Sequence, residues 1–215
     1  FFVFFPEDSR AALIAHLRAN SLRTDGPFTL RSGAVSDWYI DARQTTFDGR
    51  GAAITGRCVC DVLPGTVEAV GGMTMGADPI AVAAAVVAAA SDRSLRAFSI
   101  RKEAKDHGEG GSIVGANVHG RVLIVDDVIT AGTAIREAVD IISAEGGNTS
   151  AILIALDRQE KGQGELSAIQ EVQRDFGVSV HSIITMADLI AYIETDDNYS
   201  RYLDAMRAYR DQYGI

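Results

Sequence analysis

The amino-acid sequence predicts an α/β fold: a doubly wound, mainly parallel sheet flanked by helices, with a small N-terminal hood. Segments typical of strands alternate with segments typical of helices from about residue 66 to 195, which is the pattern of βαβ units. Residues 122–125 are apolar at every position, as expected for a strand that is buried on both faces. The chain has 215 residues, 47% of them hydrophobic, which is enough for one well-packed core.

The first third of the chain is expected to form a helix and the hood. Residues 7–19 repeat apolar side chains on one helical face, which predicts an amphipathic helix. Residues 28–41 are rich in aromatic side chains and predict a short hairpin, and residues 48–63 predict another helix. We expect one domain, with the N-terminal helix and hood in about 1–64, the α/β core in about 65–195 and a C-terminal helix in 196–215.

The core is expected to alternate short β-branched strands with longer helices. The expected strands cover residues 67–73, 95–100, 122–125, 151–156 and 178–185. The expected helices cover residues 79–90, about 134–145, 166–176, 186–193 and 198–209. We expect Asp78 to cap the helix that begins at Pro79. Since this helix has almost no polar face, we also expect it to be buried against the sheet.

The character of the chain changes at residues 101–120, which carry four basic or histidine side chains before residue 108 among five glycines. So many glycines disfavour a helix. Connections of this length in a compact domain are usually functional lids or disordered. We therefore expect a mobile loop.

Composition excludes several classes of protein. The net charge of −9 argues against a nucleic-acid binder, and no apolar run approaches the ~20 residues that span a bilayer. The opening FFVFF is too short for a signal peptide. Cys58 and Cys60 match no zinc pattern, so we expect reduced thiols in a cytoplasmic protein. We expect structural or surface roles for His16, His119 and His181.

The first candidate site follows the strand at residues 122–125. Asp126 and Asp127 close this expected strand, and a turn of small and hydroxylated residues leads into the next helix. Such a turn lets backbone N–H groups converge on an anion at a helix N-terminus, and the carboxylates could bind ribose hydroxyls or a metal. A sugar phosphate is the predicted ligand. Arg101 and Arg158 follow two other expected strands, and ligands in open sheets lie at these carboxyl ends.

Four stretches, in this order, resemble one known family. The sequence FTLRSGAVSDWYID (residues 28–41) resembles the hood segment of orotate phosphoribosyltransferases, and RKEAKDHGEGG (101–111) resembles their mobile catalytic loop. The sequence VLIVDDVITAGTA (122–134) resembles the phosphoribosyl-pyrophosphate signature of type I phosphoribosyltransferases in general. LDRQEKG (156–162) resembles the stretch with the orotate-binding arginine.

The resemblance implies transfer of ribose 5-phosphate from phosphoribosyl pyrophosphate to N1 of orotate, in the synthesis of pyrimidine nucleotides. It implies Mg²⁺ carried in on the substrate, with no direct protein ligand. It also implies a homodimer in which the mobile loop 101–120 serves the neighbouring subunit's site. The implied contacts with phosphoribosyl pyrophosphate are Arg101, Lys102, Lys105, His107, Asp126, Asp127, Val128, Ile129, Thr130, Ala131, Gly132, Thr133 and Ala134. The implied orotate contacts are Thr130, Arg158, Arg31 and Tyr39.

The reaction chemistry calls for these residue types. Breaking the bond from C1 to pyrophosphate builds positive charge on the sugar, as in glycoside hydrolysis, and negative charge on the leaving group. Carboxylates near the ribose and cations near the pyrophosphate stabilise both. The implied catalytic residues are Lys102, Lys105 and His107, on a lid that excludes water, together with Asp127.

Alternatives stay open at this point. A type I phosphoribosyltransferase for a purine base or uracil would share the signature, as would a non-catalytic sensor of phosphoribosyl pyrophosphate that regulates transcription. Arg158 could instead pair with Asp157 or Glu160. Many family members have a tyrosine-lysine pair where this chain has Thr74-Met75. Either backbone N–H groups or another cation must then take the lysine's place.

Overall fold

The computed structural model describes residues 8–29, 35–105, 111–129, 132–162, 164–195 and 199–215. Five residues with predicted roles fall outside this description. They are Arg31, His107, Thr130 and Ala131, together with the side chain of Lys105. The opening FFVFF also lies outside it.

The centre of the molecule is a six-stranded sheet with the strand order β10-β9-β8-β5-β6-β7. All neighbours pair in parallel except β6 and β7, which are antiparallel. The strands are β5 (Ala69–Met73), β6 (Arg96–Lys105), β7 (Gly111–Gly115), β8 (Arg121–Ile129), β9 (Asn148–Asp157) and β10 (Val180–Thr185). The predicted doubly wound, mainly parallel fold is confirmed.

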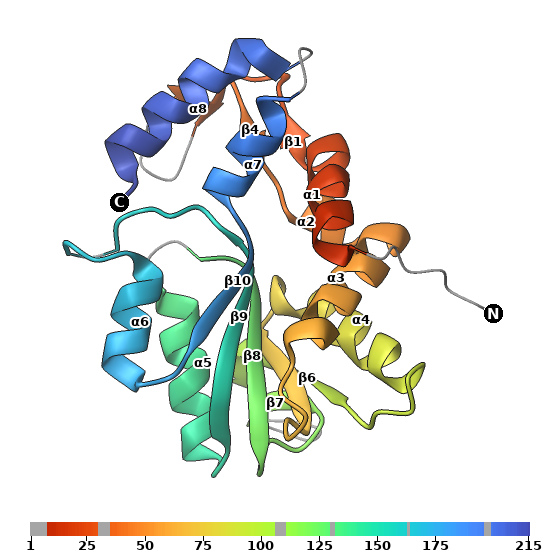
Figure 1. The fold of residues 1–215 in the computed structure, drawn as a ribbon. Helices are drawn as coiled ribbons and strands as arrows, with labels where there is room; N and C mark the ends of the chain where they lie inside the picture. The colour runs from red at the N-terminus through yellow and green to blue at the C-terminus, as the bar shows by residue number, and fades with distance from the viewer. Residues whose placement is uncertain (1–7, 30–34, 106–110, 130–131, 163, 196–198) are drawn as a thin grey trace.

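Helices cover both faces of this sheet (Figure 1). One face carries α5 (Thr133–Ala144) and α6 (Ala168–Phe176), and the other carries α3 (Gly49–Val62) and α4 (Ala77–Ala89). The strand β8 shows how the two faces are filled: Leu123 and Val125 belong to one buried cluster, and Val122 and Ile124 to the other. A run without polar residues at this position is therefore explained by burial on both faces.

A further layer lies at the carboxyl ends of the parallel strands (Figure 1). It contains α1 (Ser9–Asn20), α2 (Arg43–Thr46), α7 (Met186–Ile193), α8 (Ser200–Tyr213) and four strands of two residues each, β1 (Leu22–Arg23), β2 (Phe28–Thr29), β3 (Val35–Ser36) and β4 (Tyr39–Ile40). The antiparallel pair β2 and β3 forms the predicted hairpin, and β4 pairs with β1. This layer places hood residues next to the end of the sheet where β8 and β9 finish.

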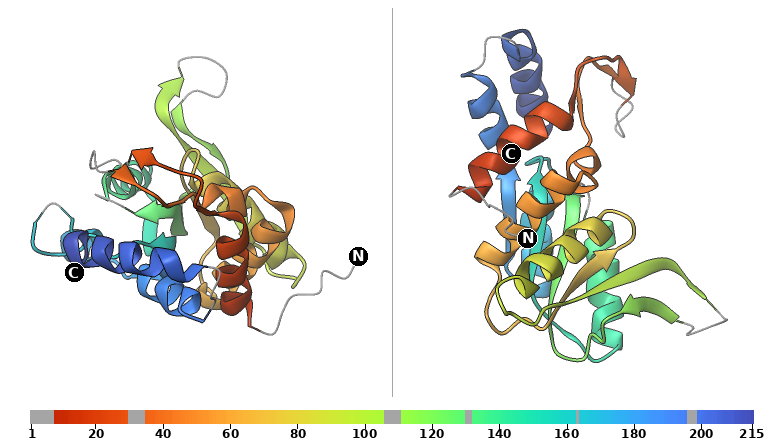
Figure 2. Two further views of the ribbon diagram at one scale, coloured as in Figure 1. Left: turned by 90° about the horizontal axis from the view of Figure 1, so that it is seen from above. Right: turned by 90° about the vertical axis from the view of Figure 1, so that its right-hand side faces the viewer.

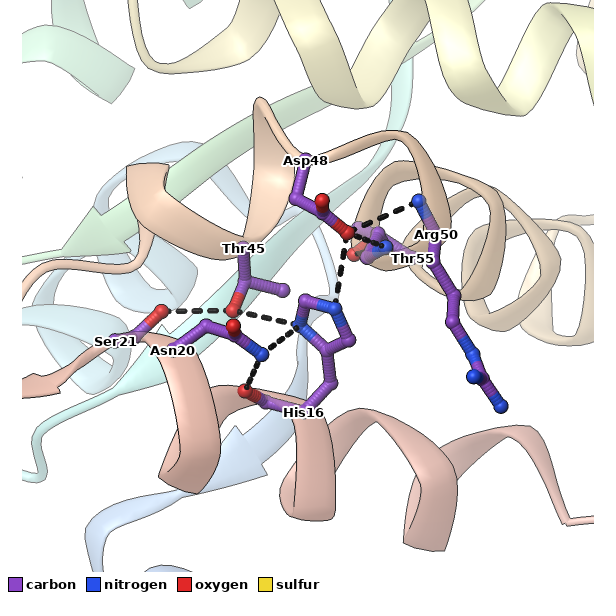
Figure 3. Close-up of polar contacts among 8 residues, drawn as sticks. His16, Asn20, Ser21, Thr45, Asp48, Arg50 and Thr55 are labelled. Atoms are coloured by element: carbon purple, nitrogen blue, oxygen red, sulfur yellow. Dashed lines mark hydrogen bonds and ion pairs between the residues drawn. The ribbon is translucent and has the colours of Figure 1, made fainter.

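His16 joins three helices in this layer, as Figure 3 shows. Its Nε2 lies 3.0 Å from Asp48 Oδ1, and its Nδ1 lies 3.2 Å from Thr45 Oγ1. Asp48 also accepts hydrogen bonds from the backbone N–H groups of Arg50 and Gly51, and so caps α3. The network links α1, α2 and the start of α3, which agrees with the structural role expected for this histidine.

The prediction of a loop over residues 101–120 is wrong for most of the residues in this range that the structure describes. The strand β6 continues to Lys105, and β7 returns antiparallel to it, pairing Ile100 with Ile113 and Lys105 with Gly111. The resulting hairpin projects from the body of the molecule (Figure 2). Glycine disfavours a helix but is tolerated in β7, an edge strand that pairs with a neighbour on one side only. The β-branched residues Ile113 and Val114 favour β structure.

The helix α4 packs against the sheet as expected, and Val82 and Val86 are exposed on its outer face. Two local predictions are also corrected. Asp78 lies inside the first turn of α4, whose cap is Gly76, and its carboxylate accepts hydrogen bonds from Thr74 and Ser99 instead. Asp126 and Asp127 lie within β8, which continues to Ile129, rather than after it. No helix in the described residues is long and apolar enough to span a membrane.

Candidate active site

Two adjacent carboxylates on β8 form the centre of the candidate site. Oδ1 of Asp126 accepts a hydrogen bond from the backbone N–H of Asp127 at 3.0 Å, and Oδ1 of Asp127 accepts one from Val128 at 2.8 Å. The turn after β5 closes against them at Gly76. A Cβ atom added to Gly76 would lie 2.6 Å from Asp126 Oδ1 and 2.7 Å from Asp127 Oδ1. Glycine therefore permits an approach that any side chain would prevent.

Burial and charge repulsion shift the titration of this pair. Burial, and then the charge of Asp127, raise the pKa of Asp126 to about 7. Two neighbouring carboxylates resist simultaneous ionisation when little water reaches them. Such a pair favours ligands that donate hydrogen bonds or carry positive charge, and sugar hydroxyls next to a developing carbocation offer both.

A small cavity, which we call the turn cavity, lies where β8 leads into α5. Its volume is about 70 Å³, and its described lining is Asp126, Val128, Ile129, Gly132, Thr133, Ala134 and Ile135. Gly132 adopts a left-handed conformation, with φ of 69°, and precedes the first helical residue, Thr133. This conformation turns the chain sharply so that the start of α5 faces the cavity, where the helix dipole favours an anion.

A larger cavity of about 430 Å³, which we call the hood cavity, adjoins the carboxylates. Its described lining is Phe28, Thr29, Tyr39, Ile40, Asp41, Ala42, Arg43, Asp127, Val128 and Arg158. Val128 also lines the turn cavity, so the two spaces are neighbours. The hood strands supply one wall and the ends of β8 and β9 supply the other. Predicted residues from three distant parts of the sequence thus meet here: Tyr39, Asp127 and Arg158.

Arg158 is held in place by contacts with the hood and with its own loop. Its Nη2 donates to the carbonyl oxygen of Ile40 at 3.4 Å, and its guanidinium carbon lies 5.7 Å from the centre of the Tyr39 ring. The Nη1 atom lies 3.8 Å from Glu160 Oε1. The pairing with Glu160 considered from the sequence therefore exists, and Arg158 lines the hood cavity at the same time.

Asp41 and Arg43 are lining residues that the sequence analysis missed. Arg43 Nε lies 2.9 Å from Asp41 Oδ1, and its pKa is raised chiefly by Asp41 and also by the charge of Asp127. The pKa of Asp41 is lowered, because its hydrogen bonds with Arg43 and Gln44 outweigh the effect of burial. The only local signal in the sequence is a pair of opposite charges directly after β4, which does not show what these side chains face.

The remaining predicted residues are not all brought together. Arg101 is half-buried and Lys102 is exposed, both on β6, which is separated from β8 by β5. Neither is among the described residues that line the two cavities. Met75, in the turn before Gly76, is exposed and uncharged. Among the described residues, no group of three or more His, Cys, Asp and Glu side chains is placed to hold a metal ion.

The arrangement combines a carboxylate pair, the start of a helix and a cavity lined by arginine at the carboxyl edge of a mainly parallel sheet. This fold and site define a type I phosphoribosyltransferase.

Comparisons with known proteins specify the class further. The orotate phosphoribosyltransferase of Salmonella typhimurium is 48% identical over 194 residues, which are 88% of this chain and 91% of the relative. The enzyme of the same name from Francisella tularensis superposes with a TM-score of 0.77 at 25% identity, covering 95% of this chain and 100% of that chain. The Mycobacterium tuberculosis enzyme, solved in complex with phosphoribosyl pyrophosphate, has a TM-score of 0.67 at 30% identity and covers 85% and 99%. No family model matches the chain.

The chain belongs to the orotate phosphoribosyltransferase family. Its members are pentosyltransferases, and the resemblance found in the four sequence stretches is confirmed over most of the chain.

Proposed function

We propose that the hood cavity and the turn cavity together hold the two substrates of orotate phosphoribosyltransferase. The enzyme transfers the ribose 5-phosphate unit of phosphoribosyl pyrophosphate to orotate, giving orotidine 5′-monophosphate and pyrophosphate. The observation that carries the assignment is the shared wall: Asp127 and Arg158, from β8 and the end of β9, line one space. A ribose at the carboxylate is therefore within reach of an acceptor at the arginine.

The donor would lie along the end of β8. Its 5-phosphate would occupy the turn cavity, where the start of α5 and the turn before it present backbone N–H groups. Asp126 and Asp127 would accept hydrogen bonds from the ribose hydroxyls. As the bond from C1 to pyrophosphate breaks, positive charge develops on the ribose, and Asp127 stabilises it electrostatically. Pyrophosphate leaves with the electron pair of the broken bond, N1 of orotate forms the new bond to C1, and the proton of N1 is released.

Orotate would lie in the hood cavity. Arg158 presents a planar fork that matches its carboxylate, and the ring of Tyr39 offers a face to the pyrimidine. Arg43, the second cation among the described lining residues, faces Asp127 and would balance the charge of the phosphates. It is our candidate for the cation that replaces the lysine absent at Met75.

Mg²⁺ would enter with phosphoribosyl pyrophosphate. Mg²⁺ in proteins is commonly held by one or two carboxylates together with substrate phosphates and water. In the proposed arrangement Asp126 and Asp127 bind the ribose hydroxyls, so the ion would be held chiefly by the substrate phosphates and water. The ion would supply charge stabilisation of the leaving pyrophosphate.

The lid assigned to residues 101–120 would supply further cations. Arg101 and Lys102 lie on the projecting hairpin, and Lys105 and His107 would follow them to the pyrophosphate. By analogy with the loss of one transition-state donor, Lys105→Ala is expected to lower kcat by about 10²–10³-fold. Steady-state kinetics with saturating substrates measure this, and near-normal turnover would refute the lid assignment.

The hairpin would serve the site of a neighbouring subunit in a homodimer. An exposed apolar groove of about 570 Å³ between α3 and α4 supports dimer formation. Val82 and Val86 are 57% and 64% exposed on its wall, beside Phe47 and a row of alanines, and such a patch marks an interaction site. A second copy of this chain is the proposed occupant.

The assembly is tested by the sedimentation of two variants. Val86→Asp is expected to convert a dimer to monomer, whereas Val62→Asp, at a residue that is 54% exposed outside the groove lining, is expected to leave it dimeric. A monomeric parent, or a dimeric Val86→Asp protein, would contradict the proposed interface.

The free thiols of Cys58 and Cys60 support a cytoplasmic location for the enzyme.

One assay tests the function as a whole. The absorbance of orotate should fall when the protein is mixed with phosphoribosyl pyrophosphate and Mg²⁺. The same protein should give no turnover with hypoxanthine, adenine or uracil. Absence of orotate turnover together with activity on one of these bases would overturn the proposal in favour of another phosphoribosyltransferase.

A further inference from the structure

The loop that carries Arg158 is tied to the last residues of the chain. Lys161 N–H donates to the carbonyl oxygen of Tyr213 at 2.9 Å, and Ile215 N–H donates to that of Gln159 at 3.2 Å. Glu160 and Gly214 form an antiparallel bridge between these two contacts. The C-terminal residues therefore act as a short added strand that fixes the backbone immediately after Arg158.

The backbone of this loop is also strained next to the arginine. Gln159 has a φ of 56°, in the left-handed region that residues other than glycine rarely adopt. Its N–H donates to Asp157 Oδ1 at 2.8 Å, and its side-chain oxygen accepts from Ala187 N–H at 2.9 Å. Strain of this kind persists only where surrounding contacts determine the conformation, and it is common at ligand sites.

A series of side-chain contacts connects α8 to Arg158. The hydroxyl of Tyr209 donates to Glu160 Oε1 at 2.7 Å, and the same oxygen lies 3.8 Å from Arg158 Nη1. Burial, followed by the neighbouring carboxylate of Glu160, raises the pKa of Tyr209, so this hydroxyl keeps its proton and acts as a donor. Glu160 and Arg158 are only 18% and 16% exposed, so their interaction is weakly screened.

Aromatic contacts fix the position of Tyr209 itself. Its ring meets the buried Trp38 edge-on, with ring centres 5.6 Å apart, and lies 4.7 Å from the ring of Tyr213. Figure 1 shows α8 running beside the hood strands that include β4. Both the hood and the C-terminal helix therefore hold the phenol that reaches Glu160.

We propose that Tyr209 and Glu160 are positioning residues for orotate, which set the orientation of the Arg158 fork before the substrate arrives. The inference rests on the proposed role of Arg158. Without the bond from Tyr209, the Glu160 carboxylate is free to rotate and to take the Nη1 and Nη2 groups away from the hood cavity. Because the chain of contacts ends at the acceptor side, recognition of phosphoribosyl pyrophosphate at Asp126 and Asp127 does not depend on it.

The experiment compares KM values for the two substrates in conservative variants. Tyr209→Phe keeps the aromatic packing and removes only the hydroxyl. It is expected to raise the KM for orotate about five- to tenfold, and to leave the KM for phosphoribosyl pyrophosphate within about twofold. Tyr213→Phe is the matched control. Its ring packs against Tyr209 and its backbone carbonyl makes the tether, and both features survive the substitution.

A double-mutant cycle distinguishes positioning from a general structural role. Glu160→Ala is expected to raise the KM for orotate, and adding Tyr209→Phe to it is expected to have no further effect, because the phenol acts through that carboxylate. Additive effects, equal changes in both KM values, or an unchanged KM for orotate in Tyr209→Phe would each overturn the inference. Absence of orotate turnover by the parent protein would instead overturn the proposed function, and this inference with it.

Discussion

The two cavities of the site are built in different ways. The turn cavity is made by a single stretch of chain, in which Asp126 is followed within a few residues by the start of α5. The hood cavity is assembled from Tyr39 and Arg43 in the hood, Asp127 on β8 and Arg158 after β9. The site at the turn cavity depends on the close approach of backbone segments, and the hood cavity depends on side chains held by their neighbours. Different substitutions should therefore impair the two cavities.

The carboxylate pair beside the turn cavity should be sensitive to added atoms. In Gly76→Ala the new methyl group would lie within 2.6–2.7 Å of both Asp126 Oδ1 and Asp127 Oδ1, so both carboxylates must move. A misplacement of about 1 Å at a reacting centre can lower activity about 10²-fold, and we expect a loss of kcat/KM of that order. Gly65→Ala, where no atom lies within 4 Å of the added Cβ, should retain full activity. Equal activity of the two variants would show that the turn adjusts easily.

The hood cavity should be sensitive to the geometry of a side chain at constant charge. Arg158→Lys keeps the positive charge but loses the planar fork and the stacking on Tyr39. We expect the KM for orotate to rise about 10–50-fold with a small change in the KM for phosphoribosyl pyrophosphate. Titration calorimetry with orotate gives an independent check. Unchanged orotate affinity in the lysine variant would refute the assignment of Arg158 to the acceptor.

These differences explain what the sequence could predict. Most of the described lining of the turn cavity belongs to the stretch that the sequence analysis singled out, because its residues are contiguous and their spacing reflects local backbone geometry. Arg158 was singled out by its place after an expected strand, Tyr39 only through the family resemblance, and Asp41 and Arg43 were missed. Nothing local in residues 41–43 shows that β4 will pair with β1 and bring them beside β8, since that contact depends on tertiary packing.

The errors in the fold have the same origin. The hairpin of β6 and β7 was expected to be a loop, because its pairing depends on residues on both sides of a glycine-rich stretch of sequence. The helix α4 packs against the sheet as expected, but its apolar sequence did not show that one apolar face would stay exposed at Val82 and Val86. In contrast, β8 and β9 were placed correctly to within a few residues, because strands buried on both faces leave a continuous apolar run.

Arg43 tests whether the hood cavity also serves the donor. Arg43→Ala should raise the KM for phosphoribosyl pyrophosphate about five- to tenfold, because a cation facing Asp127 is lost. Arg23→Ala is a closely matched control: Arg23 pairs with Asp25 at 2.6 Å, two residues away, and is 49% exposed against 52% for Arg43. Because Arg23 is not among the described residues of the hood cavity, its loss should leave both KM values unchanged. A similar effect in both variants would mean that Arg43 acts only through the stability of the hood.

The last prediction concerns folding stability near the turn cavity in the absence of substrates. Because the pKa of Asp126 is raised to about 7 in the folded protein and is about 4 in an unfolded chain, the folded state binds the proton more tightly. The stabilising contribution is therefore fully present below about pH 4 and is lost as the pH rises through about 7. Asp126→Asn removes this titration and keeps an oxygen that can accept from Asp127 N–H.

We expect the asparagine variant to gain about 3 kcal/mol of unfolding free energy relative to the parent between pH 4.5 and pH 8. Urea unfolding at the two pH values measures the gain. Asp204→Asn, at a side chain that is 98% exposed, controls for the general effect of removing a negative charge and should show the same small difference at both. A pH-independent gain in Asp126→Asn would mean that the buried pair at the end of β8 is already neutralised by its surroundings. The turn cavity would then resemble the hood cavity, where ion pairs rather than protons balance the buried charge.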